Sequence, residues 1–272
     1  MAYATNGACR LWYETLGDAA DPALLMVNGL GSQSTNYADA WCQMFADTGL
    51  FVIRFDNREV GLSSEVGPPY TLSDMAADAI AVLDAVGVAH AHVMGLSMGG
   101  MIVQTLAIEH PDRLVSMTSV MSNTGEPGFG QATPEAIALL TRAPATDRES
   151  YVQGHIAGLH EWGSPAFADE ARWRADAERA FDRSFRPNAA RHQLTAIGAS
   201  GPRAEALRNV TVPTLVIHGD RDALIDQSGG RRTAELVPGA RFELIEGMGH
   251  DYPPQLWGRW VELITGFIGS LG

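Results

Sequence analysis

The chain has 272 residues, with 32 acidic side chains against 19 lysines and arginines, and a formal net charge of −13 at pH 7. This length suits one α/β domain that carries an insertion. The acidic balance argues against binding to nucleic acid or to anionic membrane surfaces, which both need a basic face, and no apolar run is long enough to span a membrane.

The first part of the chain alternates between predicted strands and predicted helices. Residues 9–15 alternate with period two, which predicts an early antiparallel strand. Short, mainly apolar runs predict buried parallel strands, and apolar residues at helical spacing predict helices. These strands are 23–27, 51–55, 91–94 and 114–120, and these helices are 37–47, 72–86 and 100–110. The order strand, helix, strand builds a mostly parallel, doubly wound α/β sheet.

Residues 122–209 break this rhythm. No strong strand pattern occurs there, and the spacing predicts helices over 134–142, 147–162, 167–185 and 187–197. Helices inserted between two strands of such a sheet lie above its carboxyl edge, where ligands bind. We therefore expect a core of residues 1–121 and 210–272 and a helical cap of residues 122–209. The cap aromatics are expected to pack internally rather than contact substrate, and they are Trp162, Trp173, Phe181 and Phe185.

The strand and helix pattern then returns. Strands are predicted over 212–217 and 240–245, a helix over 228–237 lies between them, and an amphipathic helix over 255–271 ends the chain.

The sequence Gly95-Leu-Ser97-Met-Gly99 lies between a predicted buried strand and a predicted helix. A serine on such a sharp turn is strained and needs small neighbours, as in the nucleophile elbow. The new helix directs its N–H groups into the same space and favours an oxyanion there. The alternative is a glycine-rich turn in which the serine only caps the helix.

Four loops follow predicted parallel strands and therefore converge at one edge of the sheet; they hold Asn28, Ser97, Asp222 and His250. A serine hydroxyl needs a base, and a histidine base needs a carboxylate that holds its tautomer. The order Ser97, Asp222, His250 is the one expected for this geometry on an α/β-hydrolase sheet.

Over nearly its whole length the chain resembles α/β-hydrolase-fold enzymes, and it is most similar to the capped carboxylesterases that include aclacinomycin methylesterase. The resemblance rests on residues 28–31, 52–63, 76–84, 95–99, 210–222 and 247–250. It implies Ser97 as nucleophile, His250 as base and Asp222 as acid. It also implies that the backbone N–H groups of Leu30 and Met98 form the oxyanion hole.

Two positions depart from the family pattern. Asn28 stands where many members have histidine, so the hydrogen bonds that support the oxyanion hole are expected to differ. Glu59 and Val60 stand where relatives often have a glycine, which is expected to reshape one wall of the pocket.

Two other aspartates are candidates for the acid of the triad. Asp220 and Asp226 share the loop of Asp222, but the motif register favours Asp222. The other place for an acid, after the strand that ends at residue 120, holds Ser122 and Asn123 and no carboxylate.

Five other histidines are predicted to lie outside the triad. His218 breaks the expected order and is predicted to be a hydrogen-bonded neighbour of the pocket. His90 and His92 lie at the opposite edge of the sheet. His155 and His160 do not share a helix face well enough for a metal pair.

The sequence thus predicts a serine esterase that cleaves small to medium, largely apolar esters through an acyl-enzyme, with no cofactor and no metal. Perhydrolase and C–C hydrolase activities use the same triad, and some proteins of this fold act as ligand receptors or signalling partners. Cys9 and Cys42 are too few for a disulfide framework and are expected to be free thiols. No secretion signal is evident, so a cytoplasmic location is expected, and the oligomeric state stays open, a homodimer included.

Overall fold

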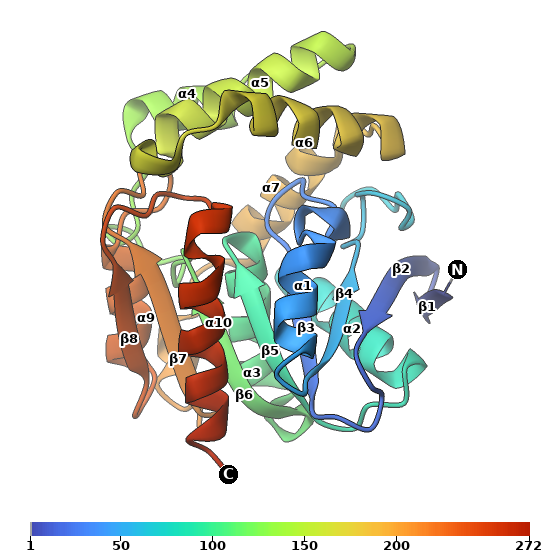
Figure 1. The fold of residues 1–272 in the computed structure, drawn as a ribbon, viewed down its shortest axis with the longest axis vertical. Coiled ribbons are helices and arrows are strands. Elements are labelled where there is room, and N and C mark those ends of the chain that lie inside the picture. The colour runs from blue at the N-terminus through green and yellow to red at the C-terminus, as the bar shows by residue number, and fades with distance from the viewer. Residues whose placement is uncertain (1) are drawn as a thin grey trace.

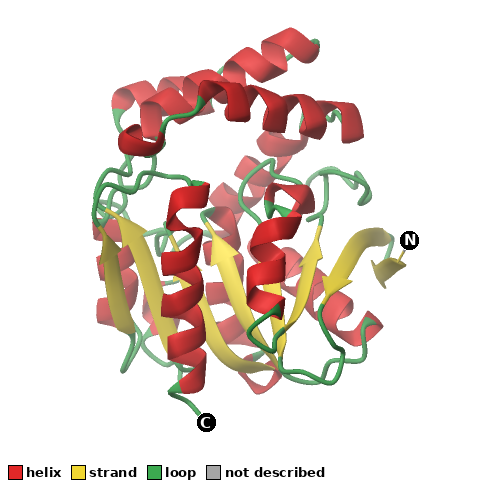
Figure 2. Cartoon of the chain, in the orientation of Figure 1, coloured by secondary structure: helices red, strands yellow, loops and turns green. Residues whose placement is uncertain are grey.

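A computed structural model describes residues 2–272, in which eight strands form a single sheet of order β1-β2-β4-β3-β5-β6-β7-β8 (Figure 2). Strands β3 to β8 pair in parallel, whereas β1 and β2 form an antiparallel hairpin at one end of the sheet. The strands are β1 (Ala2–Asn6), β2 (Cys9–Leu16), β3 (Ala23–Val27), β4 (Phe51–Phe55), β5 (Ala91–Leu96), β6 (Leu114–Val120), β7 (Thr214–Gly219) and β8 (Arg241–Ile245). This is the predicted α/β sheet, with β1 as an additional strand.

Helices cover both faces of the sheet (Figure 1). Helices α1 and α10 pack against each other on one face, while α2, α3 and α9 lie on the other. The core helices are α1 (Asp39–Ala46), α2 (Leu72–Ala85), α3 (Met98–Glu109), α9 (Ser228–Leu236) and α10 (Pro254–Gly269). The capping box of Thr71 and Asp74 fixes the start of α2.

The two faces of the sheet hold separate apolar clusters. All side chains of β3 and β5 are buried, because helices cover both of their faces. One cluster gathers around α2 and α3, and the other gathers around Trp41 of α1 and Trp260 of α10. The central strands are therefore held firmly, which fixes the positions of the loops at their ends.

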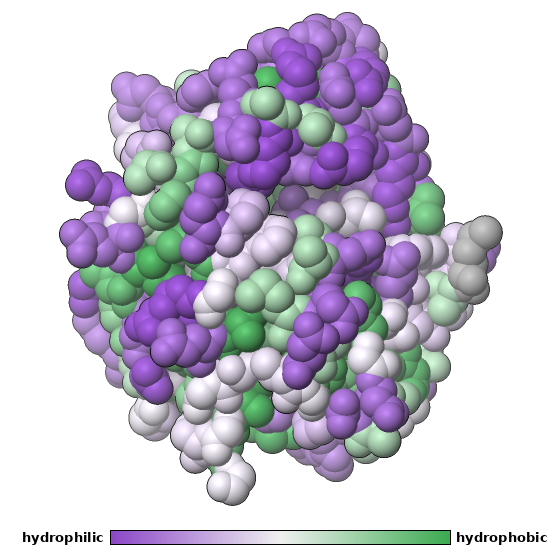
Figure 3. All heavy atoms as spheres, in the orientation of Figure 1, coloured by the Kyte–Doolittle hydropathy of each residue, from purple (hydrophilic) through white to green (hydrophobic). Residues whose placement is uncertain are grey.

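A helical insertion lies between β6 and β7, above the carboxyl ends of the strands (Figure 1). Its helices are α4 (Pro134–Leu140), α5 (Arg148–Trp162), α6 (Glu170–Arg183), α7 (Ala189–Ser200) and α8 (Ala204–Leu207). Its outer face is largely hydrophilic (Figure 3). The limits 122 and 209 for this cap stay a prediction.

The cap has a small apolar core of its own. Trp173 is buried between α5 and α6, and the rings of Phe181 and Phe185 lie 4.5 Å apart beside Tyr151. Internal packing was expected for these three aromatics and is confirmed. None of the helices within residues 2–272 is both long enough and apolar enough to cross a membrane.

Candidate active site

Ser97 occupies a sharp turn that joins β5 directly to α3. Its backbone has φ 56° and ψ −118°, outside the regions that non-glycine residues usually adopt. A Cβ at Gly95 would overlap the carbonyl of Gly99, and one at Gly99 would overlap the carbonyl of Val27. Glycine is therefore required on both sides of the serine, as the elbow hypothesis predicts.

The backbone of Ser97 is anchored on the neighbouring strand, while its side chain is free. The Ser97 N–H donates to the Val120 carbonyl at 2.9 Å, and the Ser122 hydroxyl donates to the Ser97 carbonyl at 2.8 Å. The Ser97 side chain makes no capping hydrogen bond to α3. The alternative of a serine that only caps the helix is therefore wrong.

His250 and Asp222 lie together in the loops that follow β8 and β7. The Nδ1 atom of His250 is 2.7 Å from Oδ2 of Asp222, and the carboxylate has no solvent exposure. Oδ1 of Asp222 accepts the N–H groups of Leu224 and Ile225 at 2.9 and 2.8 Å. Because Nδ1 donates its proton to this carboxylate, Nε2 of the neutral ring carries the lone pair.

The environment of Asp222 favours its charged form. Burial alone would raise the pKa of this carboxyl, but the charges and hydrogen bonds of His250 and His218 outweigh it and hold the pKa below its ordinary value. An ionised acid behind the imidazole can both orient it and stabilise its protonated form.

The other candidate acids make local contacts instead. Asp220 accepts the N–H of Gly247 at 2.6 Å, and Asp226 accepts the N–H groups of Gln131 and Ser228 at 2.7 and 2.8 Å. These bonds tie the Asp222 loop to its neighbours. Of the three aspartates in that loop, Asp222 alone is bonded to His250 within residues 2–272.

His218 also contacts Asp222, which corrects part of its prediction. Its Nε2 atom lies 2.8 Å from the carbonyl of Ile225 and 3.4 Å from Oδ2 of Asp222. The ring is fully buried, and its Nδ1 atom has no partner within the described chain. His218 was expected to be a fully hydrogen-bonded neighbour, but only its Nε2 atom is. A second imidazole therefore supports the acid.

Two backbone N–H groups next to Ser97 are unused. Within residues 2–272, neither Leu30 nor Met98 donates its N–H to another group of the protein. Leu30 belongs to the Asn28 loop, which we define as residues 28–33. The Asn28 side chain closes this loop by donating to the Gln33 carbonyl at 2.7 Å and accepting the Gly29 N–H at 3.2 Å. Asn28 therefore fixes the conformation of the loop that carries the Leu30 N–H.

Ser97 and His250 are not joined by a hydrogen bond among the described residues. Both follow parallel strands of the same sheet and lie at its carboxyl edge. Hydrogen bonds between a nucleophile and its base are often long in enzymes without substrate and tighten in the complex. The structure thus brings Asp222 to His250 and leaves the Ser97 hydroxyl without a hydrogen bond among the described residues.

The His250 loop, residues 246–251, is bound to the cap by contacts that sequence reasoning missed. The His250 N–H donates to the Trp162 carbonyl at 2.5 Å, and the Gly249 N–H donates to the Ser164 hydroxyl at 2.9 Å. The Asp251 carboxylate accepts both the N–H and the hydroxyl of Ser164. Burial raises the pKa of Asp251 above its ordinary value, and its Oδ2 atom has no partner in the described chain.

Glu59 adopts φ 78°, a left-handed conformation that favours glycine. Its buried carboxylate accepts the N–H groups of Val66 and Gly67 at 2.9 and 2.8 Å and pairs with His192 of α7 at 2.8 Å. The strained glutamate thus bonds the loop after β4 to the cap.

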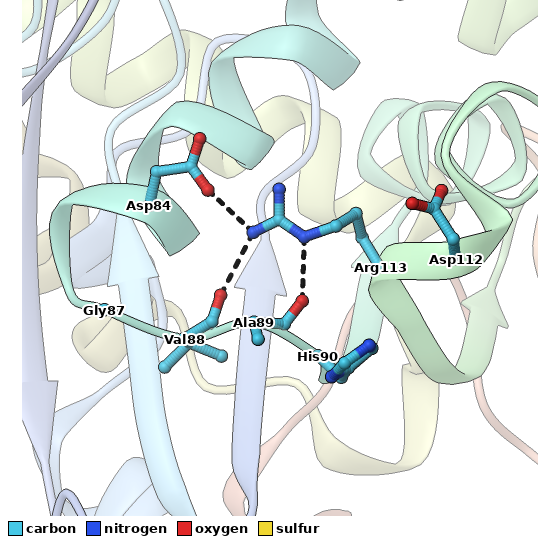
Figure 4. Close-up of a pocket in the computed structure, with 7 residues that line it drawn as sticks. All are labelled: Asp84, Gly87, Val88, Ala89, His90, Asp112 and Arg113. Atoms are coloured by element: carbon cyan, nitrogen blue, oxygen red, sulfur yellow. Dashed lines mark hydrogen bonds and ion pairs between the residues drawn. The ribbon is translucent and has the colours of Figure 1, made fainter.

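One surface hollow lies far from these residues. It measures about 410 Å³ and lies at the amino-terminal end of β5, at the opposite end of the strand from Ser97 (Figure 4). Arg113 bridges its wall by donating to Asp84 and to the carbonyls of Val88 and Ala89. No group of three metal-ligating side chains comes together within residues 2–272, and both cysteines are buried and unpaired.

Comparisons with known proteins agree with this architecture. The profile of the alpha/beta hydrolase fold family matches residues 22–252. Rhodomycin D methylesterase DnrP of Streptomyces peucetius is 32% identical, over 92% of this chain and 91% of that protein. 3-Oxoadipate enol-lactonase 2 of Acinetobacter baylyi is 27% identical, over 93% and 91%. The crystal structure of esterase RhEst1 from Rhodococcus sp. ECU1013 superposes with a TM-score of 0.80 at 25% identity, covering 99% and 98% of the two chains.

Proposed function

This chain belongs to the α/β-hydrolase fold family, and on that premise we propose that it is a carboxylic ester hydrolase for small to medium, largely apolar substrates. Ser97 acts as the nucleophile, His250 as the base and Asp222 as the acid. The observation that carries the proposal is the 2.7 Å bond between His250 and Asp222, at the same sheet edge as the strained turn of Ser97.

The first half-reaction transfers the acyl group to the enzyme. Ser97 Oγ attacks the ester carbonyl carbon while Nε2 of His250 takes the hydroxyl proton. The oxyanion receives the N–H groups of Leu30 and Met98, and each donor of this kind contributes roughly 10²–10³ in rate. The carbon–oxygen bond then breaks, and His250 returns the proton to the leaving alcohol.

The second half-reaction restores the enzyme. Water gives a proton to Nε2 of His250 and attacks the acyl carbon, and the acid leaves as Ser97 regains its hydroxyl proton. The free lone pair on Nε2 supports this role, because Nδ1 is occupied by the bond to Asp222. The methylesterase and lactonase relatives support an ester, open or cyclic, as the bond that is cleaved.

The test is a series of p-nitrophenyl esters from acetate to palmitate, together with alkyl methyl esters and simple lactones. Wild type and Ser97→Ala are assayed side by side, and intact-protein mass spectrometry follows the acyl-enzyme. We expect turnover that favours short or medium chains and an acyl adduct on Ser97. The Ser97→Ala variant should lose about 10⁴-fold or more of the activity without losing stability.

Turnover that survives in Ser97→Ala would contradict the proposed nucleophile. Absence of turnover over the whole series, together with ligand-dependent binding of a protein partner, would instead favour the receptor hypothesis.

A further inference from the structure

The cap reaches into the Asn28 loop with a buried glutamine. Gln193 of α7 has no solvent exposure, and its Oε1 atom accepts the Gly31 N–H at 2.7 Å. Its Nε2 atom donates to the carbonyl of Arg58 at 2.8 Å. One side chain of the cap thus joins the Asn28 loop to the loop after β4.

A second contact holds the other end of the same loop. The Gln33 amide donates to the carbonyls of Ala180 and Ser184 at 2.7 and 2.9 Å, at the end of α6. Arg183 donates to Oε1 of Gln33 at 2.6 Å and to the buried carboxylate of Asp56 at 2.8 Å. The Asn28 loop is therefore bonded to the cap at two positions that follow Leu30, Gly31 and Gln33.

The bond from Gln193 restrains a glycine whose backbone would otherwise be flexible. Gly31 has φ 67°, and a glycine exchanges easily between left-handed and right-handed conformations when nothing restrains it. The Gly31 N–H belongs to the Leu30–Gly31 peptide, which shares the Leu30 Cα with the preceding peptide that carries the Leu30 N–H. The Ser32 N–H closes this turn by donating to the Gly29 carbonyl at 3.3 Å. The bond from Gln193 fixes the orientation of the Leu30–Gly31 peptide inside the turn.

We propose that Gln193 is a positioning residue for the oxyanion hole, and this inference rests on the proposed esterase function. The cap amide holds Gly31 so that the Leu30 N–H faces the reacting carbonyl. Removing the bond lowers stabilisation of the transition state more than binding of the ground-state ester, because the oxyanion exists only after attack.

The experiment compares two buried glutamines. Gln193→Met removes both hydrogen bonds at nearly constant volume. The matched control is Gln104→Met, because Gln104 of α3 is equally buried but bonds to Ser119, Thr233 and Arg203, away from the Asn28 loop. Tm, kcat and KM are measured with the best p-nitrophenyl ester, along with Ki for a trifluoromethyl ketone, which forms a hemiketal oxyanion.

We expect Gln193→Met to lower kcat by roughly 10- to 100-fold while KM stays within about twofold of the wild-type value. The Ki for the trifluoromethyl ketone should rise by a factor similar to the loss of kcat. Gln104→Met should lower Tm comparably and keep kcat within about twofold of wild type. Gln193→Asn keeps a polar amide in the site while withdrawing it from Gly31. This variant covers the case in which Gln193→Met does not fold, and it should show the same loss of kcat.

Equal kcat losses in the two methionine variants, or wild-type kcat in Gln193→Asn, would overturn this inference while leaving the esterase intact. A wild-type protein without Ser97-dependent turnover would instead overturn the proposed function, and the inference with it.

Discussion

The imidazole of His250 is bonded to the carboxylate of Asp222 across 28 positions of sequence, with Nδ1 2.7 Å from Oδ2. The two residues meet because β7 and β8 run in parallel and deliver their following loops to one edge of the sheet. The bond fixes which ring nitrogen carries a proton, and most predictions about the activity depend on that choice.

Replacing Asp222 by asparagine should lower kcat by about 10⁴-fold, because an amide no longer holds the tautomer or stabilises the imidazolium. The low pKa of Asp222 keeps it ionised at neutral pH, so its titration should not contribute to the acid limb of the activity profile near neutrality. Steady-state kinetics against pH test both statements. The control is Asp226→Asn in the same loop, and equal losses in the two variants would contradict the assignment.

His218→Leu should reduce stability more than activity. The carbonyl of Ile225 would lose its donor, which costs roughly 1–3 kcal/mol in the free energy of unfolding. We expect kcat to fall by less than about tenfold, since the bond between Asp222 and His250 remains. Denaturant unfolding and kinetics on the same sample measure the two effects. A kcat loss as large as that of Asp222→Asn would place His218 in the proton transfer itself.

Two glycines near the serine should respond differently to alanine. At Gly95 the added Cβ would lie 2.7 Å from the Gly100 nitrogen and closer still to the Gly99 carbonyl, so we expect a loss of roughly 3 kcal/mol or more. At Gly29 the added Cβ would lie 3.3 Å from the Ser97 Cβ, which a small shift can relieve. Gly29→Ala should therefore fold and lose about tenfold in kcat. Thermal unfolding and ester turnover distinguish the two cases. A Gly95→Ala variant as stable as wild type would contradict the close contact between Gly95 and the first turn of α3.

Asp251→Asn should increase the free energy of unfolding at neutral pH. Burial raises the pKa of Asp251, so the folded state binds a proton more readily than the unfolded chain. Between the unfolded value of about 3.9 and the raised folded value, stability of the wild type therefore falls as pH rises. Above that window the unfavourable charge is fully present, and asparagine removes it.

The gain from Asp251→Asn should shrink as pH falls through the folded pKa and vanish below about pH 4. Denaturant unfolding from pH 4 to 8 measures it. Asp112→Asn, at an exposed carboxylate, is the matched control and should leave the free energy of unfolding nearly unchanged at every pH. A lower free energy of unfolding for Asp251→Asn than for wild type at neutral pH would contradict this prediction.

Much of the fold followed from local patterns. The strands β3, β4 and β6 were located correctly. In β3 a strand covered on both faces leaves a continuous apolar run, and in β4 and β6 the predominance of apolar and β-branched residues was sufficient. The elbow was visible because close packing of Gly95 and Gly99 demands glycine. Strand β1 was missed, since its short run of small and polar residues is defined by its pairing with β2 rather than by its own hydrophobicity.

The contacts between the cap and the core lay outside what a pattern can predict. Gln193 and Gly31 are separated by 162 positions, and nothing in the helical spacing of α7 shows that its glutamine reaches the core. Ser164 and Asp251 likewise meet only through tertiary packing. The burial that raises the pKa of Asp251 results from the same packing. The raised pKa could therefore not be anticipated from the position of Asp251 next to His250 in the sequence.

The insertion is bonded to the catalytic loops through Ser164 on one side and Gln33 and Gln193 on the other. A chimera that exchanged the helices between β6 and β7 for those of a relative would break these bonds. The incoming helices would need side chains that bond to Gly31, Gln33 and Asp251, because otherwise the loops beside Ser97 and His250 would lose their support.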